Sequence, residues 1–283
     1  MPEKILQDDQ LDKQLLETGF AVVSFLNQKE TSALVDFFYQ HHPNGVSGFY
    51  ATAHSHDIAF RNRMNDEIKK NFQRAIGNYF HKCTALGGSF VVKSNTQKER
   101  LHPHQDWNIV DEEQHRSFNI WVPLVDLTEK NGTIRVMPGS HRWVKNYRGP
   151  NIPDLSESAQ EQIWQRMTPL YMKAGEALIY DHRLFHASDS NTTDELRIAT
   201  VFGIIPERAQ MLYYYGNGKQ VEIYKSSANF FLNENMQKGN LILQKVNTVQ
   251  LPVVSFSQFL QLEETSVNRV KKTGLFNFIR RLF

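Results

Sequence analysis

The sequence has few of the features that define several common protein classes. One cysteine, Cys83, in 283 residues excludes an internal disulfide and a cysteine-based zinc site. The 32 basic and 30 acidic residues nearly balance, which argues against nucleic acid as the main partner. No apolar run near the N-terminus is long enough for a signal peptide or a membrane span. We therefore expect a reducing compartment, the cytoplasm.

The composition is that of an ordinary globular protein. Hydrophobic residues make up 40% of the chain and charged residues 22%, so disorder is excluded as the main state. A chain of this length can bury a large core without disulfides or structural metals. We expect one domain over residues 1–283, with a core at about 15–210 and a C-terminal extension over 211–283.

Apolar spacing separates a helical first third from a strand-rich remainder. Helices are expected over residues 30–40 and 64–83, and Gly87-Gly88 is expected to end the second one. Expected strands are residues 19–25, 89–94, 102–107, 117–123, 133–137, 175–180, 196–204 and 219–224. This pattern predicts a mainly β fold with flanking helices (α+β), arranged as a sandwich or barrel. Residues 144–170 are expected to form a long insertion that serves as a lid or pocket wall.

The stretch LHPHQDW, residues 101–107, suggests a metal site. On a strand, side chains two apart point to the same side, so His104 and Asp106 project together and His102 shares their parity. Histidines with one carboxylate suit non-haem Fe(II), with open positions for a co-substrate and O2. The third ligand must come from elsewhere, and both His182 and His186 are candidates.

One further pattern points to an anionic co-substrate, and another places two residues on a common face. Arg197 begins an apolar strand and needs an anionic partner if it points inward. A bound dicarboxylate is a natural partner, because guanidinium binds carboxylate in a two-pronged arrangement. Asn119 and Trp121 share one face of the expected strand 117–123.

In their order and spacing, these motifs resemble the phytanoyl-CoA dioxygenase family of Fe(II)/2-oxoglutarate-dependent oxygenases. The matching pieces, across about residues 85–205, are His104-Gln-Asp106-Trp107, Asn131-Gly-Thr, Pro138-Gly-Ser-His141, Gly175-Glu-Ala-Leu, His186-Ala-Ser188 and Arg197. The resemblance implies a double-stranded β-helix, a jelly-roll or cupin-like barrel. It also favours His186 over His182 as the third ligand.

The resemblance implies a role for each matching residue. His104, Asp106 and His186 would ligate iron, while Arg197 and Ser188 would bind the far carboxylate of 2-oxoglutarate. Trp121 would line the co-substrate pocket beside Asn119, and Lys93 or Asn95 would add a further contact.

The implied activity is hydroxylation of an unactivated C–H bond of a small molecule by O2, with release of succinate and CO2. Relatives that halogenate have a small residue where this chain has Asp106, so hydroxylation is favoured over halogenation. Alternatives on the same fold are a desaturase or epimerase, or a metal-binding or sensor protein without turnover.

The C-terminal quarter matches no known pattern. Residues 269–283 are basic, and Gly274–Phe283 would be amphipathic as a helix. Such a segment suits an anionic membrane surface and suggests a lipid-like substrate, whereas docking on the protein's own body is the alternative. The aromatic run Met211–Tyr215 is expected to pack in the interior rather than to border the pocket.

Overall fold

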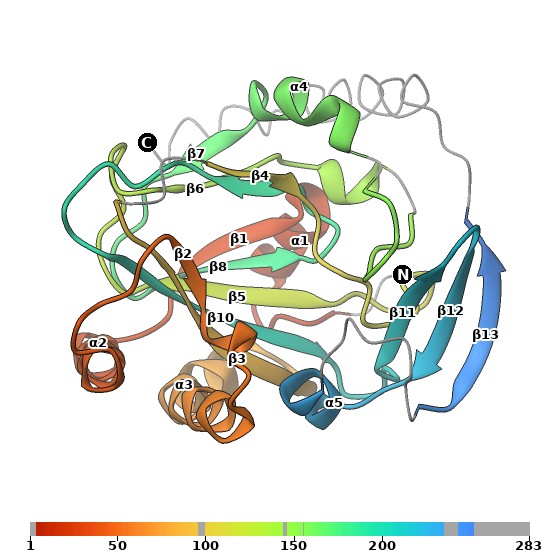
Figure 1. Cartoon of the computed structure of the whole chain (residues 1–283), viewed down its shortest axis with the longest axis horizontal. Helices are drawn as coiled ribbons and strands as arrows, with labels where there is room; N and C mark the ends of the chain where they lie inside the picture. The colour runs from red at the N-terminus through yellow and green to blue at the C-terminus, as the bar shows by residue number, and fades with distance from the viewer. Residues whose placement is uncertain (1–3, 96–99, 144–145, 155, 235–242, 252–283) are drawn as a thin grey trace.

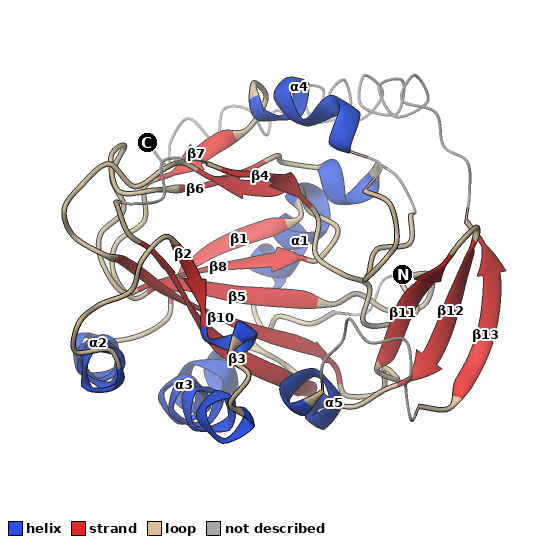
Figure 2. Ribbon diagram, in the orientation of Figure 1, coloured by secondary structure: helices blue, strands red, loops and turns tan. Residues whose placement is uncertain are grey.

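The computed structural model describes residues 4–95, 100–143, 146–154, 156–234 and 243–251. Two β-sheets face each other, helices flank the larger one, and a smaller third sheet stands at one end (Figures 1 and 2). The helices are α1 Asp9–Thr18, α2 Gln28–His41, α3 Ile58–Tyr79, α4 Gln160–Trp164 and α5 Ala228–Asn233. The strands are β1 Phe20–Ser24, β2 Phe49–Ala51, β3 Cys83–Lys93, β4 Leu101–His104, β5 Phe118–Pro123, β6 Ile134–Val136, β7 Thr168–Leu170, β8 Glu176–Asp181, β9 His186–Ser188, β10 Arg197–Pro206, β11 Leu212–Asn217, β12 Gln220–Lys225 and β13 Lys245–Gln250. The expected mainly β fold with flanking helices is confirmed.

The larger sheet has six antiparallel strands in the order β1-β8-β5-β10-β3-β2. Its two faces alternate along each strand, as the pleat requires. Phe118, Ile120 and Val122 of β5 lie in the core beneath α2 and α3, whereas Trp121 faces the second sheet. The parity expected for this strand is therefore confirmed.

Helix α3 differs from its expected bounds, 64–83. It begins at Ile58 behind the cap residue Asp57 and ends at Tyr79. The apolar spacing continues to Cys83 because that residue opens β3, the strand beneath the helix. Gly87-Gly88 therefore lies inside β3 and does not end the helix. A Cβ on Gly88 would lie 2.9 Å from Ile68 of α3, so glycine lets helix and strand pack closely.

The smaller sheet has the order β4-β9-β6-β7 and faces the larger one. Apolar side chains from both sheets meet between them, among them Leu178 and Ala199 from the larger sheet and Ile134 and Val136 from the smaller. The ends of β4 and β9 border this interior, and the candidate site lies there. The expected insertion, residues 144–170, contributes α4 and β7 to the same part of the fold.

The third sheet, β11-β12-β13, lies beyond the other two (Figure 1). Tyr213 packs against Phe230 of α5, with ring centroids 4.8 Å apart, and Tyr214 is buried with Val221. The packing role expected for the run 211–215 is thus confirmed. The tail 269–283 lies outside the described residues, so its membrane contact stays a prediction.

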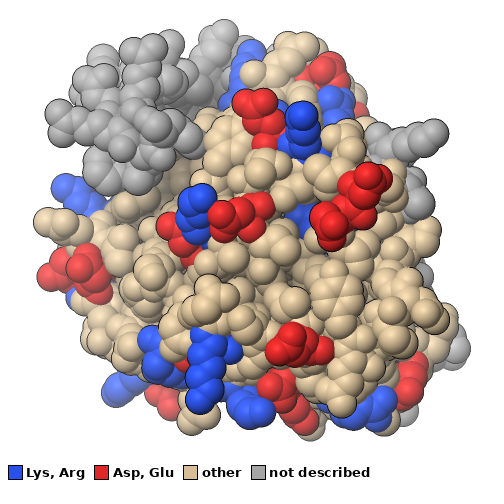
Figure 3. Space-filling model, turned by 90° about the vertical axis from the view of Figure 1, so that its left-hand side faces the viewer, with Lys and Arg blue, Asp and Glu red and all other residues tan. Residues whose placement is uncertain are grey.

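Surface charge is mixed on the face shown in Figure 3, where Lys and Arg side chains occur among Asp and Glu. Within the described ranges, no helix combines the length and the apolar character needed to cross a membrane.

Candidate metal centre

Three potential metal ligands converge between the two sheets. His104 ends β4 and pairs with His186, which begins β9. One ligand atom from each of His104, Asp106 and His186 lies within 4.8 Å of the other two. The nearest Asp106 oxygen is 3.8 Å from Nε2 of His186, and the two imidazole rings are 4.2 Å apart. This spacing leaves room for one ion between the three side chains.

Asp106 reaches this place by a route that differs from the expected strand 102–107. Strand β4 ends at His104, so Asp106 lies in the following loop and not in the sheet. Its backbone N–H donates to the carbonyl of His182 at 2.9 Å. Its Oδ2 accepts a hydrogen bond from Nδ2 of Asn119 at 2.8 Å. The side chain therefore points at the histidines because neighbouring segments hold it, and strand parity is not the reason.

Both histidines present Nε2 to the centre. Nδ1 of His104 is 2.8 Å from the carbonyl oxygen of His102, and Nδ1 of His186 is 3.1 Å from that of Leu184. An N–H at each Nδ1 satisfies these contacts and leaves the Nε2 lone pairs as the ones that can bind a metal.

Electrostatics favour the ligating protonation states. Burial and the neighbouring His104 lower the pKa of His186 to about 4, so the ring is neutral at pH 7. Burial opposes ionisation of Asp106, but His186, His182 and His104 and the Asn119 hydrogen bond bring its pKa to about 2. Neutral imidazole with ionised carboxylate is the pairing that binds a divalent cation.

His182, the rival third ligand, lies outside this group. Its Nδ1 is 3.0 Å from the hydroxyl of Ser117, in the buried interior. Burial is also the main reason why its pKa is lowered. The structure brings His186 to the other two ligands and leaves His182 behind Asp106. His102 is exposed, and Nε2 of His141 lies 3.1 Å from the carbonyl oxygen of Leu16, away from the centre.

A cavity of about 190 Å³ opens beside the three ligands. Arg197, Ser188, Trp121 and Asn119 line it together with the three ligands, as the sequence led us to expect. The guanidinium of Arg197 lies 5.4 Å from the centre of the Trp121 ring.

Arg197 is the most unusual charge in the cavity. Only 2% of the residue is exposed, and its Nε and Nη1 find no hydrogen-bond partner among the described residues. Burial lowers its pKa to about 10, so it keeps its charge at pH 7. The Ser188 hydroxyl is buried without a partner as well. A cation and a hydroxyl left unsatisfied in one cavity fit an anionic ligand with a carboxylate at that end.

Lys93 does not line this cavity. It pairs with Arg197 across the β3–β10 ladder, and its ammonium donates to the carbonyls of Ser188 at 3.3 Å and Asp189 at 2.8 Å. Burial and the charge of Arg197 lower its pKa to about 7. Asn95, the alternative residue, donates to Asp194 at the surface. Lys93 thus supports the Ser188 main chain, and it also borders a neighbouring cavity beside His104, so its contact with the co-substrate stays a prediction.

Other residues that line the cavity belong to no sequence motif and were not predicted. Tyr180 of β8 places its hydroxyl 3.4 Å from Nε2 of His186. Val91 and Val201 could have been found by strand alternation with Lys93 and Arg197, but Phe49 of β2 gave no signal. Phe49, Leu101 and His104 also border an adjoining cavity of about 390 Å³, which extends toward Arg100, His102 and Gln160 of α4. Gln160 is the residue of the expected insertion 144–170 that borders this adjoining cavity, and the insertion's role as a lid or pocket wall stays a prediction.

Comparison with known proteins was consistent with this geometry. A family model described as Phytanoyl-CoA dioxygenase (PhyH) matches residues 22–199, more than half of the chain. "Dioxygenase trt7" of Aspergillus terreus is 32% identical over 90 residues, 32% of this chain and 27% of that protein. "Phytanoyl-CoA dioxygenase" of Arabidopsis thaliana is 27% identical over 124 residues, 43% of this chain and 40% of that protein. These matches span less than half of either relative.

Solved structures share the fold. The epimerase SnoN, in complex with Fe3+, alpha ketoglutarate and nogalamycin RO, has a TM-score of 0.56 at 18% identity and covers 88% of this chain and 96% of its own. The carbocyclase SnoK from nogalamycin biosynthesis has a TM-score of 0.52 at 16% identity. The match covers 72% of this chain and 86% of the SnoK chain. At these identities the likeness shows the fold, and the double-stranded β-helix is confirmed.

Proposed function

Because the chain belongs to the phytanoyl-CoA dioxygenase family, we propose that it is an Fe(II)- and 2-oxoglutarate-dependent oxygenase that acts on a small molecule. One observation carries the proposal: a His-Asp-His group and an unpartnered buried arginine share a cavity of about 190 Å³. When bound, Fe(II) with 2-oxoglutarate supplies the oxidation of an unactivated C–H bond by O2, with release of succinate and CO2.

In this proposal the chain's own residues bind and orient. His104, Asp106 and His186 hold the iron through two imidazole nitrogens and one carboxylate oxygen. Arg197 and Ser188 bind the far carboxylate of 2-oxoglutarate, because two guanidinium nitrogens of Arg197 and the Ser188 hydroxyl are buried at the cavity without a hydrogen-bond partner among the described residues. Asn119 keeps Asp106 oriented, and Trp121 forms the wall beside Arg197. Lys93 holds the main chain that carries Ser188.

Hydroxylation is the reaction that we propose. Asp106 supplies a carboxylate at the third protein position and leaves no vacant position for a halide there. The epimerase and the carbocyclase share the fold, so the fold by itself does not favour hydroxylation over those reactions.

Anaerobic titration with Fe(II) and 2-oxoglutarate tests the site. We expect a visible charge-transfer band in the wild type and its loss in His104→Ala. His102→Ala is the matched control, because this exposed histidine lies two residues away and outside the ligand group. It should retain the band.

Three results separate the alternatives. No band in folded wild-type protein contradicts the proposal. A band with no succinate release on admission of O2, across a panel of candidate small molecules, favours the metal-binding or sensor protein. Succinate release that depends on His104 and requires a substrate supports the oxygenase.

A further inference from the structure

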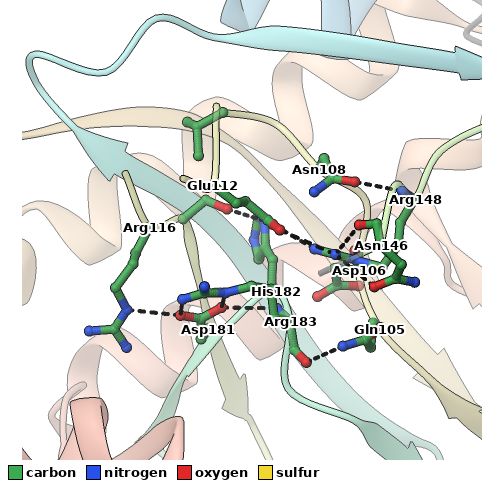
Figure 4. A network of polar contacts seen from close by, with 12 residues as sticks. Gln105, Asp106, Asn108, Glu112, Arg116, Asn146, Arg148, Asp181, His182 and Arg183 are labelled. Atoms are coloured by element: carbon green, nitrogen blue, oxygen red, sulfur yellow. Dashed lines mark hydrogen bonds and ion pairs between the residues drawn. The ribbon is translucent and has the colours of Figure 1, made fainter. Parts of the chain in front are cut away.

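Asp106 has main-chain support that no sequence motif explains. Because it lies beyond β4, no ladder hydrogen bond fixes its backbone. Instead its N–H donates to the His182 carbonyl at 2.9 Å, and its carbonyl accepts from Nε of Arg148 at 2.6 Å. The peptide groups on both sides of the Asp106 Cα are therefore held, and the direction of the carboxylate follows from them. Figure 4 shows Arg148 reaching across to this loop.

Arg148 is itself held by a two-pronged ion pair with Glu112. Its Nη2 is 2.6 Å from Oε1 and its Nη1 is 3.2 Å from Oε2 of that carboxylate (Figure 4). Both side chains are largely buried, 8% and 13% exposed. Main-chain contacts lock the same two loops, because Asn108 N–H donates to the Arg148 carbonyl at 3.1 Å and the Asn108 side chain accepts from Arg148 N–H at 2.5 Å.

Strand β11 forms hydrogen bonds to both loops, the one that carries Glu112 and the one that carries Arg148. Its Leu212 N–H donates to the Ile109 carbonyl and its Tyr214 hydroxyl donates to the Val110 carbonyl, each at 2.9 Å. Its Gly216 N–H donates to the Pro150 carbonyl at 2.9 Å. The loop that carries Glu112 and the loop that carries Arg148 are thus both tied to the third sheet.

A buried ion pair contributes little net stability compared with apolar residues of the same shape, because desolvation offsets the attraction. Its advantage is geometric, since a guanidinium fork fixes orientation in a plane. We propose that Arg148 and Glu112 are positioning residues that set the direction of Asp106 toward the metal, and that β11 completes this support. The inference rests on the proposed function and gives the C-terminal sheet a role in it.

The test compares metal affinity with stability in Arg148→Met and Glu112→Gln. Co(II) serves as a redox-stable probe, with its dissociation constant and visible spectrum measured beside the thermal midpoint. Loss of groups that orient a ligand weakens metal binding about 10- to 100-fold. We expect that range for Arg148→Met, a smaller loss for Glu112→Gln, which keeps one acceptor, and an altered Co(II) spectrum in both.

Arg74→Met is the matched control. Arg74 pairs with Glu30 at 2.7 Å between α3 and α2, away from the metal ligands. It should lower the thermal midpoint without changing Co(II) affinity or spectrum. If Arg148→Met does not fold, the Co(II) affinity and spectrum of Tyr214→Phe and Glu112→Gln test the positioning role instead. Tyr214→Phe removes one hydroxyl-to-carbonyl bond of the brace, and Tyr79→Phe removes a similar bond to Ser24 elsewhere.

The outcomes separate the two proposals. Wild-type Co(II) affinity and spectrum in the folded Arg148, Glu112 and Tyr214 variants would overturn the positioning role and leave the proposed function intact. Equal loss of affinity in Tyr79→Phe and Tyr214→Phe would overturn it too, because the effect would then follow general stability. Failure of the wild type to bind Co(II) or Fe(II) would overturn the proposed function and the inference together.

Discussion

Replacing Arg197 by methionine separates ligand binding from protein stability. The Arg197 guanidinium is buried, and its Nε and Nη1 have no hydrogen-bond partner among the described residues. Methionine has a similar length without the charge and fills irregular space well. We therefore expect the ligand-free variant to be more stable than the wild type, although a large polar residue has been removed from the interior.

The magnitude follows from the pKa. A fall from 12.5 to about 10 corresponds to about 3 kcal/mol of free energy against the charged form. The nearby Trp121 ring returns about 1 kcal/mol by cation–π attraction. The free energy of unfolding of Arg197→Met should thus rise by about 2 kcal/mol at pH 7. The folded protein loses the Arg197 proton above a pKa of about 10, whereas the unfolded chain keeps it up to 12.5. The buried charge therefore lowers the free energy of unfolding by its full amount below pH 10, and by less as the pH rises further.

Chemical denaturation with and without 2-oxoglutarate, in the presence of Co(II), is the assay. At 100 times its dissociation constant, 2-oxoglutarate should stabilise the wild type by about 2.7 kcal/mol and the variant far less. A 2-oxo acid without the second carboxylate is the control and should affect both proteins alike. A variant that is less stable than the wild type, or one that gains as much from 2-oxoglutarate, would refute this reasoning.

The remaining predictions concern the histidines. His186→Ala should abolish Co(II) binding, whereas His182→Ala should weaken it without abolishing it, as measured by titration; the reverse order would make His182 the ligand. Stability of the metal-free protein should fall from pH 7 to pH 4, because burial lowers the pKa of His186 to about 4 and of His141 to about 3. Below 6.5 the unfolded chain binds more protons than the folded one, so unfolding is favoured as the pH falls. Denaturation midpoints at pH 7 and pH 5 measure this, His141→Gln should flatten the slope, and a midpoint independent of pH would contradict it.

Local patterns in the sequence predicted much of the fold. The two-residue alternation of side chains along residues 117–123 located β5 and assigned its residues to two faces. This worked because successive side chains of a strand point to opposite sides of the sheet, and both sides of this strand are packed. Helix α3 was found, but its end was misplaced, since the apolar spacing of 80–83 continues into β3. Short strands such as β2 and β9 were missed, whereas β6, which is equally short, was located within the expected strand 133–137.

In the candidate site, too, residues that belong to a local motif could be predicted, and residues that depend on distant contacts could not. His104, Asp106, His186 and Arg197 could be named because their chemistry and spacing form a motif. The contact expected for Lys93 or Asn95 stays a prediction, because the ammonium of Lys93 donates to main-chain carbonyls while the residue borders the adjoining cavity. Arg148 and Glu112 could not be named at all, since an ion pair between two loops leaves no pattern in the chain.

The place of β10 has a consequence for how the chain is made. This strand lies between β5 and β3 in the larger sheet, and β9, which brings His186 to His104, is made just before it. During synthesis, β3 and β5 therefore wait with open edges until residue 206 has left the ribosome, and open edges can pair with other chains. Contacts so distant in sequence also form slowly. A chain that ends before residue 206 should therefore aggregate rather than fold, because β3 and β5 would each keep an open edge that only β10 can pair.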